Sequence, residues 1–315
     1  MVRTPKYLIY INGTDTTDVI FDKLISMSIV DNANNESDEL DISVSGNFTR
    51  PKYEDEIKVY LGYGIDVSLV GLYKVQRTSK NFTQLSISAT SVDFSDSFKV
   101  KRHVTYENVS IKQIVSQVAA RHGLEVKCDY DDLYVLSQAQ TNESDMHFIN
   151  RLAKEYNAIF NVKDKTLYFV KKIKDGGKSE DLPRYGIDVN YCSSINIEHS
   201  NTTLYNSCEV SWHDTKENKT IKRYYPKSAE EPILKLRGSF KNEALAIERA
   251  KAQLEKANQG LIKGSLKKEG ELIFAGGVVN LVNNIDLDSS EYQITKVTHN
   301  LSKQSGWTTT IDFES

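Results

Sequence analysis

Two groups of acidic residues are the strongest candidates for catalysis in this chain of 315 residues. The tripeptide Glu-Asp-Glu occupies positions 54–56, and Asp129, Asp131 and Asp132 form a second group. Glycoside hydrolysis needs two carboxyl groups that face one cleft and have well-separated pKa values. Both groups lie in sequence typical of surface turns, where contact with water explains them. We therefore predict no catalytic residue and no enzyme; a tail-associated cell-wall hydrolase that uses Glu54 or Asp131 is an alternative.

The histidines and the remaining carboxylates do not have the spacing of metal ligands. Asp286 and Asp288, followed by Glu291, match half of a calcium loop but lack its central glycine and its distal glutamate. A hydrated hairpin turn is the better interpretation. The six histidines form no HxxxH or HExxH motif; they are His103, His122, His147, His199, His213 and His299. We predict no bound metal.

Motifs for nucleophiles and nucleotide cofactors are also missing from the sequence. It contains no G-x-S-x-G, no G-x-G-x-x-G and no Walker sequence. The three cysteines, Cys128, Cys192 and Cys208, are odd in number, widely spaced and without a CxxC pair. We expect them to be free buried thiols in a reducing cytosol, and we predict no cofactor.

Composition and charge argue against two further classes of protein. The chain has 40 Lys and Arg against 43 Asp and Glu, and no segment has the basic excess that neutralises many phosphates. Its mean hydropathy is −0.46, and no apolar run approaches the roughly 20 residues that cross a bilayer. The N-terminus lacks the apolar core of a secretory signal. We expect no specific nucleic-acid binding and no membrane insertion.

The first hundred residues have the period-two pattern of half-buried β-strands. Asn12-Gly13 is a typical hairpin turn, and the polar run 31–39 is expected to be an exposed loop. The alternating runs predict strands at 6–11, 40–44, 57–61, 72–77 and 85–89. This pattern indicates an antiparallel β domain.

The middle of the chain changes to helical spacing. Ser110 and Gln113 form a capping box for a helix over about 110–122. Ser144 is the expected N-cap of a second helix with one apolar stripe, and strands are expected at 158–162 and 166–170. The stretch 174–183 is typical of a linker. Together these elements predict a small α/β module.

The last third returns to β patterning and contains one long helix. Strands are expected at 194–198, 207–212 and 220–225, and a helix spans about Asn242 to Gln259. This helix could support a ring of subunits, but packing against its own β domain is the favoured interpretation.

Two segments of the chain share one pattern, and this pattern suggests a duplication. Segments 56–89 and 278–313 each predict three consecutive antiparallel strands, with a tyrosine at the start of the middle strand, Tyr73 and Tyr292. The sequence thus predicts an α+β fold, mainly β. The expected domains are a β domain over 1–103, the α/β module over 104–183 and a second β domain over 184–315.

Two stretches resemble a known family. Residues 72–102 lead from a strand pair into a basic segment, and residues 140–152 contain Glu143-Ser144-Asp145 followed by Phe148 and Arg151-Leu152. These features resemble the phage late control D proteins, the tail hubs of P2-like contractile phages, R-type pyocins and related injection systems. The resemblance is good over 5–185 and looser elsewhere. It implies that the two β domains are tube-like barrels flanking the α/β module.

The resemblance also implies a function and partners. A hub of this family is a homotrimer whose six similar barrels form a pseudo-sixfold ring, joining the sixfold tail tube to the threefold spike within the baseplate. A duplicated β domain is what a threefold protein needs to present sixfold symmetry. We expect a structural hub of a phage tail or tail-like particle, assembled in the bacterial cytoplasm.

The end of the chain bears on the spike. The sequence ends at Ser315, after the last expected strand, without a spike repeat. We therefore expect a separate spike protein as partner. The other alternative is a monomeric β-rich module that binds carbohydrate, which exposed aromatic side chains would favour.

Overall fold

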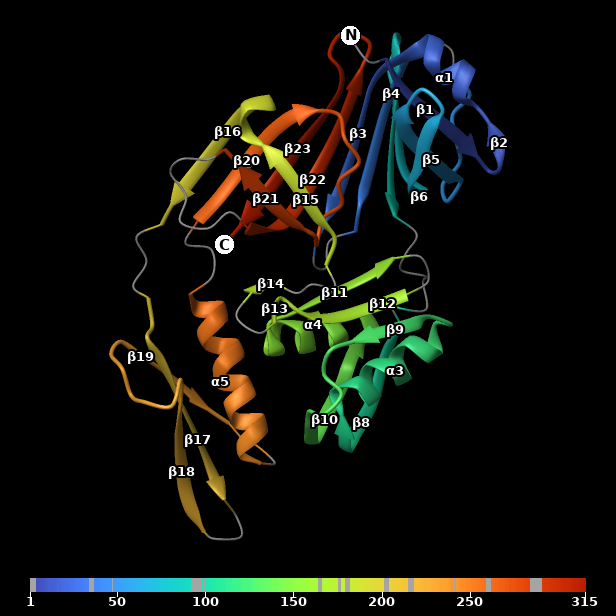
Figure 1. The fold of residues 1–315 in the computed structure, drawn as a ribbon. Coiled ribbons are helices and arrows are strands. Elements are labelled where there is room, and N and C mark those ends of the chain that lie inside the picture. Colours follow the sequence, from blue (N-terminus) through green and yellow to red (C-terminus); the bar gives the residue numbers. More distant parts are fainter. Residues whose placement is uncertain are drawn as a thin grey trace. The chain divides into compact units, whose positions relative to one another are not determined.

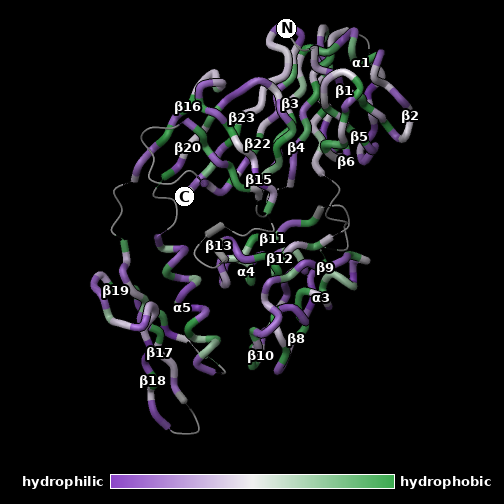
Figure 2. The backbone as a smooth tube through the Cα atoms, viewed as in Figure 1, coloured by the Kyte–Doolittle hydropathy of each residue, from purple (hydrophilic) through white to green (hydrophobic). Residues whose placement is uncertain are grey.

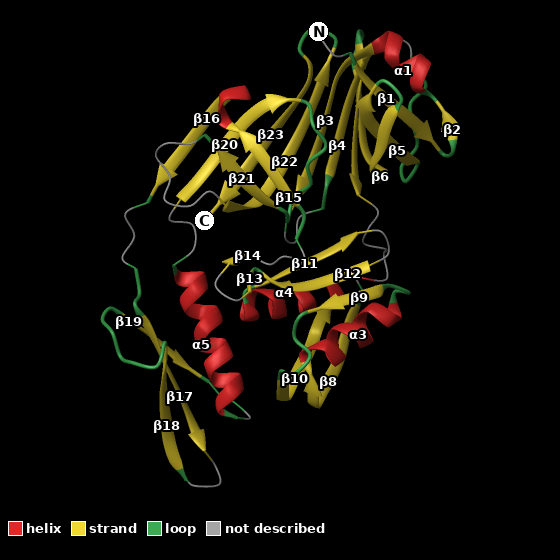
Figure 3. Ribbon diagram, in the orientation of Figure 1, coloured by secondary structure: helices red, strands yellow, loops and turns green. Residues whose placement is uncertain are grey.

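The structure is a computed structural model of the chain. It describes residues 4–33, 37–46, 48–91, 98, 100–163, 166–174, 177–178, 182–200, 204–214, 218–238, 240, 242–258, 262–283 and 291–315. Strands predominate among them, as expected (Figure 3).

The chain forms two compact units. Unit 1 contains Met1–Asp93, Leu182–Ile197 and Lys263–Glu314, and unit 2 contains Phe94–Asp181 and Glu198–Ile262. These units group the chain differently from three consecutive domains at 1–103, 104–183 and 184–315. Both β segments belong to unit 1 because their strands join in one sheet. The three-domain division itself stays a prediction.

The first half of unit 1 is built from the opening strands of the chain (Figure 1). The five strands expected there all form, and two more strands, β2 and β3, appear where none was expected. The elements are β1 (Pro5–Ile11), β2 (Thr14–Asp15), α1 (Thr17–Lys23), β3 (Leu24–Asn32), β4 (Glu39–Ser45), β5 (Glu56–Tyr63), β6 (Asp66–Lys80) and β7 (Gln84–Ser91).

The second half of unit 1 is built from later segments. Its elements are β15 (Arg184–Asp188), a 3-10 turn (Val189–Tyr191), β16 (Cys192–His199), β20 (Ile262–Glu269), β21 (Val278–Val282), β22 (Glu291–Ser302) and β23 (Gly306–Glu314). Hydrophobic and hydrophilic residues alternate along the strands of the large sheet in both halves (Figure 2). The two halves join where β22 pairs antiparallel with β3.

The two halves have the same order of strands. Hydrogen-bonded neighbours run β3-β4-β7-β6-β5-β1 in the first half and β16-β20-β23-β22-β21-β15 in the second. In each half the strands take the same places when numbered along the chain. One difference is that β1 pairs with β5 antiparallel, whereas β15 pairs with β21 in parallel.

Local details of the halves match as well. Tyr73 pairs with Ile57, and Tyr292 pairs with Val279; both tyrosines are buried. Three residues after each tyrosine the pairing register shifts, between Val75 and Arg77 in β6 and between Ile294 and Lys296 in β22. The expected duplication of segments 56–89 and 278–313 is therefore confirmed by pairing as well as by pattern.

The turn before the first strand of each triplet, β5 or β21, repeats too. Glu54 and Gly276 both have positive φ, +66° and +81°. The amide of Glu54 donates to Val75 O at 2.9 Å, and the amide of Gly276 donates to Ile294 O at 3.0 Å. A non-glycine residue with positive φ is uncommon, so this shared geometry reflects a common fold.

Unit 2 contains the α/β module. The expected helices are present as α3 (Ile111–Arg121) and α4 (Asp145–Tyr156), and the expected strands as β11 (Ala158–Lys163) and β12 (Thr166–Lys171). The remaining elements are β8 (Lys101–Ser110), β9 (Glu125–Cys128), β10 (Tyr134–Ser144), β13 (Ile173–Lys174) and β14 (Gly177–Lys178). β8 pairs with β10, and β12 lies between β11 and β9.

The long helix has surroundings that differ from those expected. It is α5 (Glu243–Ala257), capped by the Asn242 side chain, which accepts from Leu245 N at 2.8 Å; residue 259 lies outside the described part of the chain. Its small and apolar residues pack on a sheet of β17 (Ser207–Asp214), β18 (Lys219–Tyr225) and β19 (Ile233–Arg237). The helix therefore covers a separate sheet in unit 2. The expectation that it packs against the second β-barrel was wrong.

No helix in the described ranges is long and apolar enough to span a membrane.

Candidate functional site

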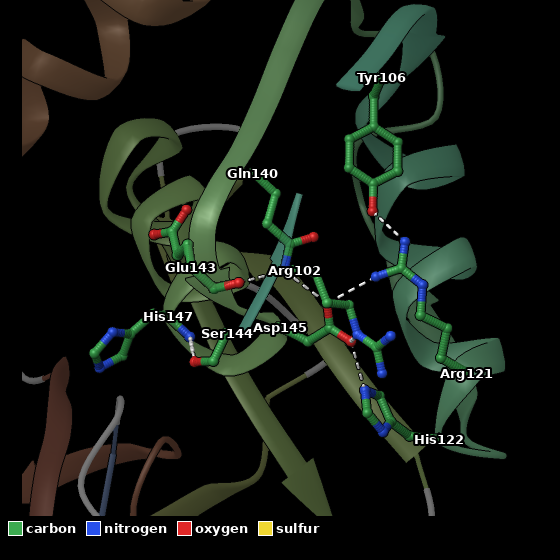
Figure 4. A network of polar contacts seen from close by, with 9 residues as sticks. All are labelled: Arg102, Tyr106, Arg121, His122, Gln140, Glu143, Ser144, Asp145 and His147. Atoms are coloured by element: carbon green, nitrogen blue, oxygen red, sulfur yellow. Dashed lines mark hydrogen bonds and ion pairs between the residues drawn. The ribbon is translucent and has the colours of Figure 1, made fainter. Parts of the chain in front are cut away.

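The most connected polar group in unit 2 surrounds Asp145, at the start of α4 (Figure 4). Ser144 caps this helix, and its hydroxyl accepts from His147 N at 3.3 Å. Asp145 is the first helical residue, where a negative charge suits the helix dipole. Its side chain is completely buried. The same position therefore fixes a charge inside the module.

Donors from three other elements converge on this carboxylate. Oδ1 accepts from Arg121 Nη1 at 2.7 Å and from Gln140 Nε2 at 2.8 Å. Oδ2 lies 3.1 Å from Arg102 Nε and 2.9 Å from His122 Nε2. These residues come from the end of α3, from β10 and from β8. Asp145 thus links both strands of the β8–β10 pair to both helices of the module.

The neighbours of the network are held in turn. Arg121 also donates to the Tyr106 hydroxyl at 2.6 Å, and Gln140 donates to Glu143 O at 2.9 Å. The His122 ring stacks on Phe98 with centroids 3.6 Å apart. A carboxylate offers about four acceptor sites, and four donors fill them here. Asp145 therefore has no acceptor site left for a substrate. This geometry fits a structural role, in which the carboxylate holds the elements of the module together.

A second ion-pair group lies on the outer side of α4. Arg151 pairs with Glu143 at 3.0 Å and with Glu155 at 3.2 Å, and it donates to Ala139 O at 2.8 Å. Arg249 of α5 reaches the other oxygen of Glu155 at 2.9 Å. These contacts tie α5 to the module within unit 2.

A shallow open depression of about 790 Å³ lies beside this group, lined by Lys101, Ala139, Thr141, Asn142, Glu143, Ser144, Met146, His147 and Arg151. Its charged side chains are a lysine, an arginine and a glutamate, with an exposed histidine. Because Arg151 already pairs with Glu143, the lining does not present the two separated carboxyl groups of a hydrolase.

The acidic tripeptide at 54–56 forms a turn in unit 1. The Asp55 carboxylate accepts from Asn12 Nδ2 at 2.9 Å and from Lys52 N at 2.7 Å. These hydrogen bonds, that from Asn12 foremost, lower the pKa of Asp55. The amide of Glu56 donates to Asn12 Oδ1 at 2.8 Å. Asp55 and Asn12 therefore lock two turns together, and Glu54 takes the positive φ noted above.

The second acidic group also has structural roles. Asp129 accepts from Lys171 N at 3.0 Å, which joins the end of β9 to β12. Asp131 pairs with Lys112 at 2.5 Å on the surface, and Asp132 is exposed in the turn before β10. Asp55, Asp129 and Asp131 thus each contact a structural partner.

The histidines and cysteines are distributed as follows. His103, His147, His199 and His213 are exposed, and His122 belongs to the Asp145 network. All three cysteines are free, but Cys208 alone is fully buried, and burial raises the pKa of both Cys128 and Cys208 to about 11. No group of potential metal ligands forms among the described residues, and Asp286 and Asp288 lie outside them.

His299 is buried in unit 1. Its ring contacts Thr309 Oγ1 at 3.1 Å and Ile273 O at 3.3 Å, and the Trp307 indole donates to it at 3.4 Å. Burial lowers the pKa of His299 to about 4. A buried histidine that is neutral at pH 7 and has polar contacts at both ring nitrogens is a core residue.

Sequence reasoning did not identify the Asp145 network. Residues 140–152 attracted notice through a family resemblance, while the partners Arg102, Arg121 and His122 lie 43, 24 and 23 residues away. Gln140 gave no local signal either, because it lies five residues after Val135, the other buried residue of β10, and a period-two pattern needs an even spacing.

Known proteins resemble this chain over nearly its whole length. No family model matches it. It is 23% identical to the "Probable baseplate hub protein" of Escherichia phage P2, over 99% of this chain and 93% of that protein. It is 25% identical to the protein of the same name from Escherichia phage 186, over 98% of this chain and 92% of that protein.

Solved structures agree in fold. A tail protein from Neisseria meningitidis MC58 superimposes with a TM-score of 0.71 at 14% identity, over 99% of this chain and 97% of that one. The expected resemblance is confirmed and extends beyond residues 5–185. The chain is similar to phage baseplate hub proteins in sequence and to a tail protein in fold, and the two sequence relatives support a structural tail-hub role.

Proposed function

We propose that this protein is the structural hub of a contractile phage tail or a related injection particle, and that it acts as a homotrimer. The observation that supports this proposal most strongly is the repeated strand order of unit 1, β3-β4-β7-β6-β5-β1 and β16-β20-β23-β22-β21-β15. Two equivalent halves per chain give six in a trimer, which is the number of subunits expected in a ring of the tail tube.

The proposed partners follow from the difference between the threefold symmetry of the hub and the sixfold symmetry of the tail tube. One face of the ring meets the sixfold tail tube, and the other meets a threefold spike, with further baseplate components around it. The similarity to baseplate hub proteins of two phages supports this placement in the virion tail. The protein is not an enzyme in this proposal: the predicted acids hold turns and strands, and Asp145 is filled by four donors.

Co-expression with the spike protein encoded beside this gene tests the proposal. We expect light scattering of the purified complex to give three copies of this 35.7 kDa chain for each spike trimer. A chain that remains monomeric both alone and with the spike would contradict it. The competing roles give different results: a hydrolase would release soluble fragments from purified peptidoglycan, and a carbohydrate-binding module would retain glycan as a monomer.

A further inference from the structure

One buried titratable group lies where the two halves of unit 1 meet. This group is the imidazole of His299 on β22, the strand that pairs with β3 of the first half (Figure 1). Trp307 on β23 donates from its indole N–H to this ring at 3.4 Å. The indole itself packs into the hydrophobic core of the first half. His299 and Trp307 therefore link the two halves through one hydrogen bond and the packing of one large ring.

The contacts of the imidazole determine which of its nitrogens carries the proton. Nε2 lies 3.3 Å from the carbonyl oxygen of Ile273. A carbonyl oxygen only accepts, so Nε2 carries the proton of the neutral ring and Nδ1 is the acceptor. Nδ1 has two neighbours, Thr309 Oγ1 at 3.1 Å and Trp307 Nε1 at 3.4 Å. Thr309 donates its own hydroxyl hydrogen to Glu271 O at 2.9 Å, which leaves the lone pair of Nδ1 for the indole N–H.

A proton on Nδ1 changes this arrangement, because both ring nitrogens are then donors. Nδ1–H can donate to Thr309 Oγ1, since the hydroxyl hydrogen of Thr309 points to Glu271 O. The indole N–H of Trp307 then faces a donor and has lost its acceptor. A buried donor without a partner is costly, and Trp307 is only 4% exposed. Protonation of His299 thus favours movement of the indole.

The Trp307 indole has close neighbours from both halves of unit 1. It stacks on the Tyr63 ring of β5 with centroids 5.2 Å apart. A Cβ atom on Gly270 would lie 2.1 Å from the indole, so the glycine makes room for this ring. Leu301 pairs with Trp307 on one side and with Met27 of β3 on the other. Movement of the indole would therefore disturb the core beside the β22–β3 junction.

The other titratable groups around His299 have partners of their own. The Asp31 carboxylate and the Tyr185 hydroxyl accept from backbone amides at 2.8 and 3.2 Å, and the Glu271 carboxylate pairs with Lys268. Burial lowers the pKa of His299 to about 4, and its hydrogen bond to a backbone carbonyl opposes this shift. Because carboxylates also take up protons in acid, a variant at His299 is needed to separate its effect from theirs.

We propose that His299 and Trp307 form an acid-sensitive latch between the halves of unit 1. A proton on Nδ1 of His299 puts a donor in the place of the acceptor of the indole N–H, and the indole then leaves its buried position beside the β22–β3 junction. At neutral pH the latch is closed, and acid opens it while unit 2 keeps its fold. This device belongs to the fold of unit 1 and does not depend on the proposed hub function.

Acrylamide quenching of tryptophan fluorescence in the full-length chain tests the latch. The chain has two tryptophans, Trp212 in unit 2 and Trp307. In Trp212→Phe, we expect quenching of Trp307 to rise at least about twofold between pH 7 and pH 4, because the indole loses its buried acceptor. His299→Gln supplies an acceptor and a donor that do not titrate, and it should abolish the rise in the same background. The matched control, His103→Gln, changes an exposed histidine of unit 2 and should leave the rise intact.

Three results would overturn the proposal. Constant quenching of Trp307 between pH 7 and pH 4 is the first, and Trp212→Phe reveals it even if His299→Gln does not fold. A rise that persists in His299→Gln would assign the effect to the neighbouring carboxylates. An equal rise for Trp212, followed in Trp307→Phe, would show that acid unfolds the whole chain and not the junction of unit 1.

Discussion

Replacement of Asp145 by asparagine changes one oxygen of a fully buried carboxylate into an NH₂ group. That group would face either Arg121 and Gln140 or Arg102 and His122, which are donors themselves. Loss of one partner from a buried ion pair costs about 3–5 kcal/mol. The Arg102 and Arg121 side chains are 34% and 24% exposed and can partly recover hydration. We therefore expect the lower end, about 3 kcal/mol.

Hydrogen exchange of backbone amides measures this loss locally. At about 1.4 kcal/mol for each factor of ten, Asp145→Asn should accelerate exchange in α3 and α4 roughly 100-fold. Strands β4 and β7 of unit 1 should keep their rates and serve as an internal reference. The matched control is Asp131→Asn, the same chemical change in an ion pair whose side chains are 47% and 55% exposed. Surface pairs contribute about 0–1 kcal/mol.

Two results would refute this reasoning. If Asp145→Asn accelerated exchange no more than Asp131→Asn, the four donors would not depend on the negative charge. If exchange in β4 and β7 rose equally, the substitution would act on the whole protein and not on the α/β module.

Three further predictions concern stability. The pKa of His299 is lowered to about 4, against about 6.5 in an unfolded chain. As the pH falls, the unfolded state therefore gains the proton first. The free energy of unfolding of unit 1 should decrease by about 3 kcal/mol as the pH falls from 6.5 to 4. His299→Gln should flatten this dependence in urea unfolding, and an unchanged slope would contradict the assignment. Ser110→Ala removes the cap of α3 and should cost about 1 kcal/mol, whereas Ser116→Ala within the same helix should cost less than half as much; equal unfolding midpoints would count against the capping box. Gly62→Ala would place Cβ 1.7 Å from a backbone carbonyl oxygen and should cost at least about 2 kcal/mol, whereas Gly186→Ala meets no atom within 4 Å and should be nearly neutral in thermal unfolding; similar melting temperatures for both would show that the clash relaxes.

Local features of the sequence were sufficient to predict much of the fold. The side chain of Ser110 accepts from Gln113 N at 3.1 Å and that of Gln113 accepts from Ser110 N at 2.8 Å, so the predicted capping box is confirmed. Such contacts span three residues, and the spacing of residue types reveals them directly. The duplicated strand triplets were visible for the same reason, because alternation and a shared tyrosine are local.

Strands with weak alternation were missed. β8 and β10 pair with each other, and few of their residues are buried, among them Tyr106, Val135 and Gln140. Their polar sequences therefore lack the period-two signal. β3 extends to Asn32, into the segment 31–39 that was expected to be an exposed loop. Asp31 is buried there because it accepts from Ala275 N at 2.8 Å, a partner 244 residues away.

Contacts between residues far apart in the sequence could not be predicted, because they depend on how the whole module packs. Asp145 has the composition of a helix start, and its burial follows from Arg102, Arg121 and His122, whose approach depends on the whole module. The sheet of α5 and β17–β19 is a similar case. Helical spacing predicted α5, but the face that it covers is a matter of tertiary packing.

An electron cryomicroscopy map of the hub purified with its spike protein tests the ring most directly. We expect three copies of the chain and six barrel-like densities at one radius. Rings in which the two halves of a chain lie at different radii would contradict the proposal that each chain contributes two equivalent parts.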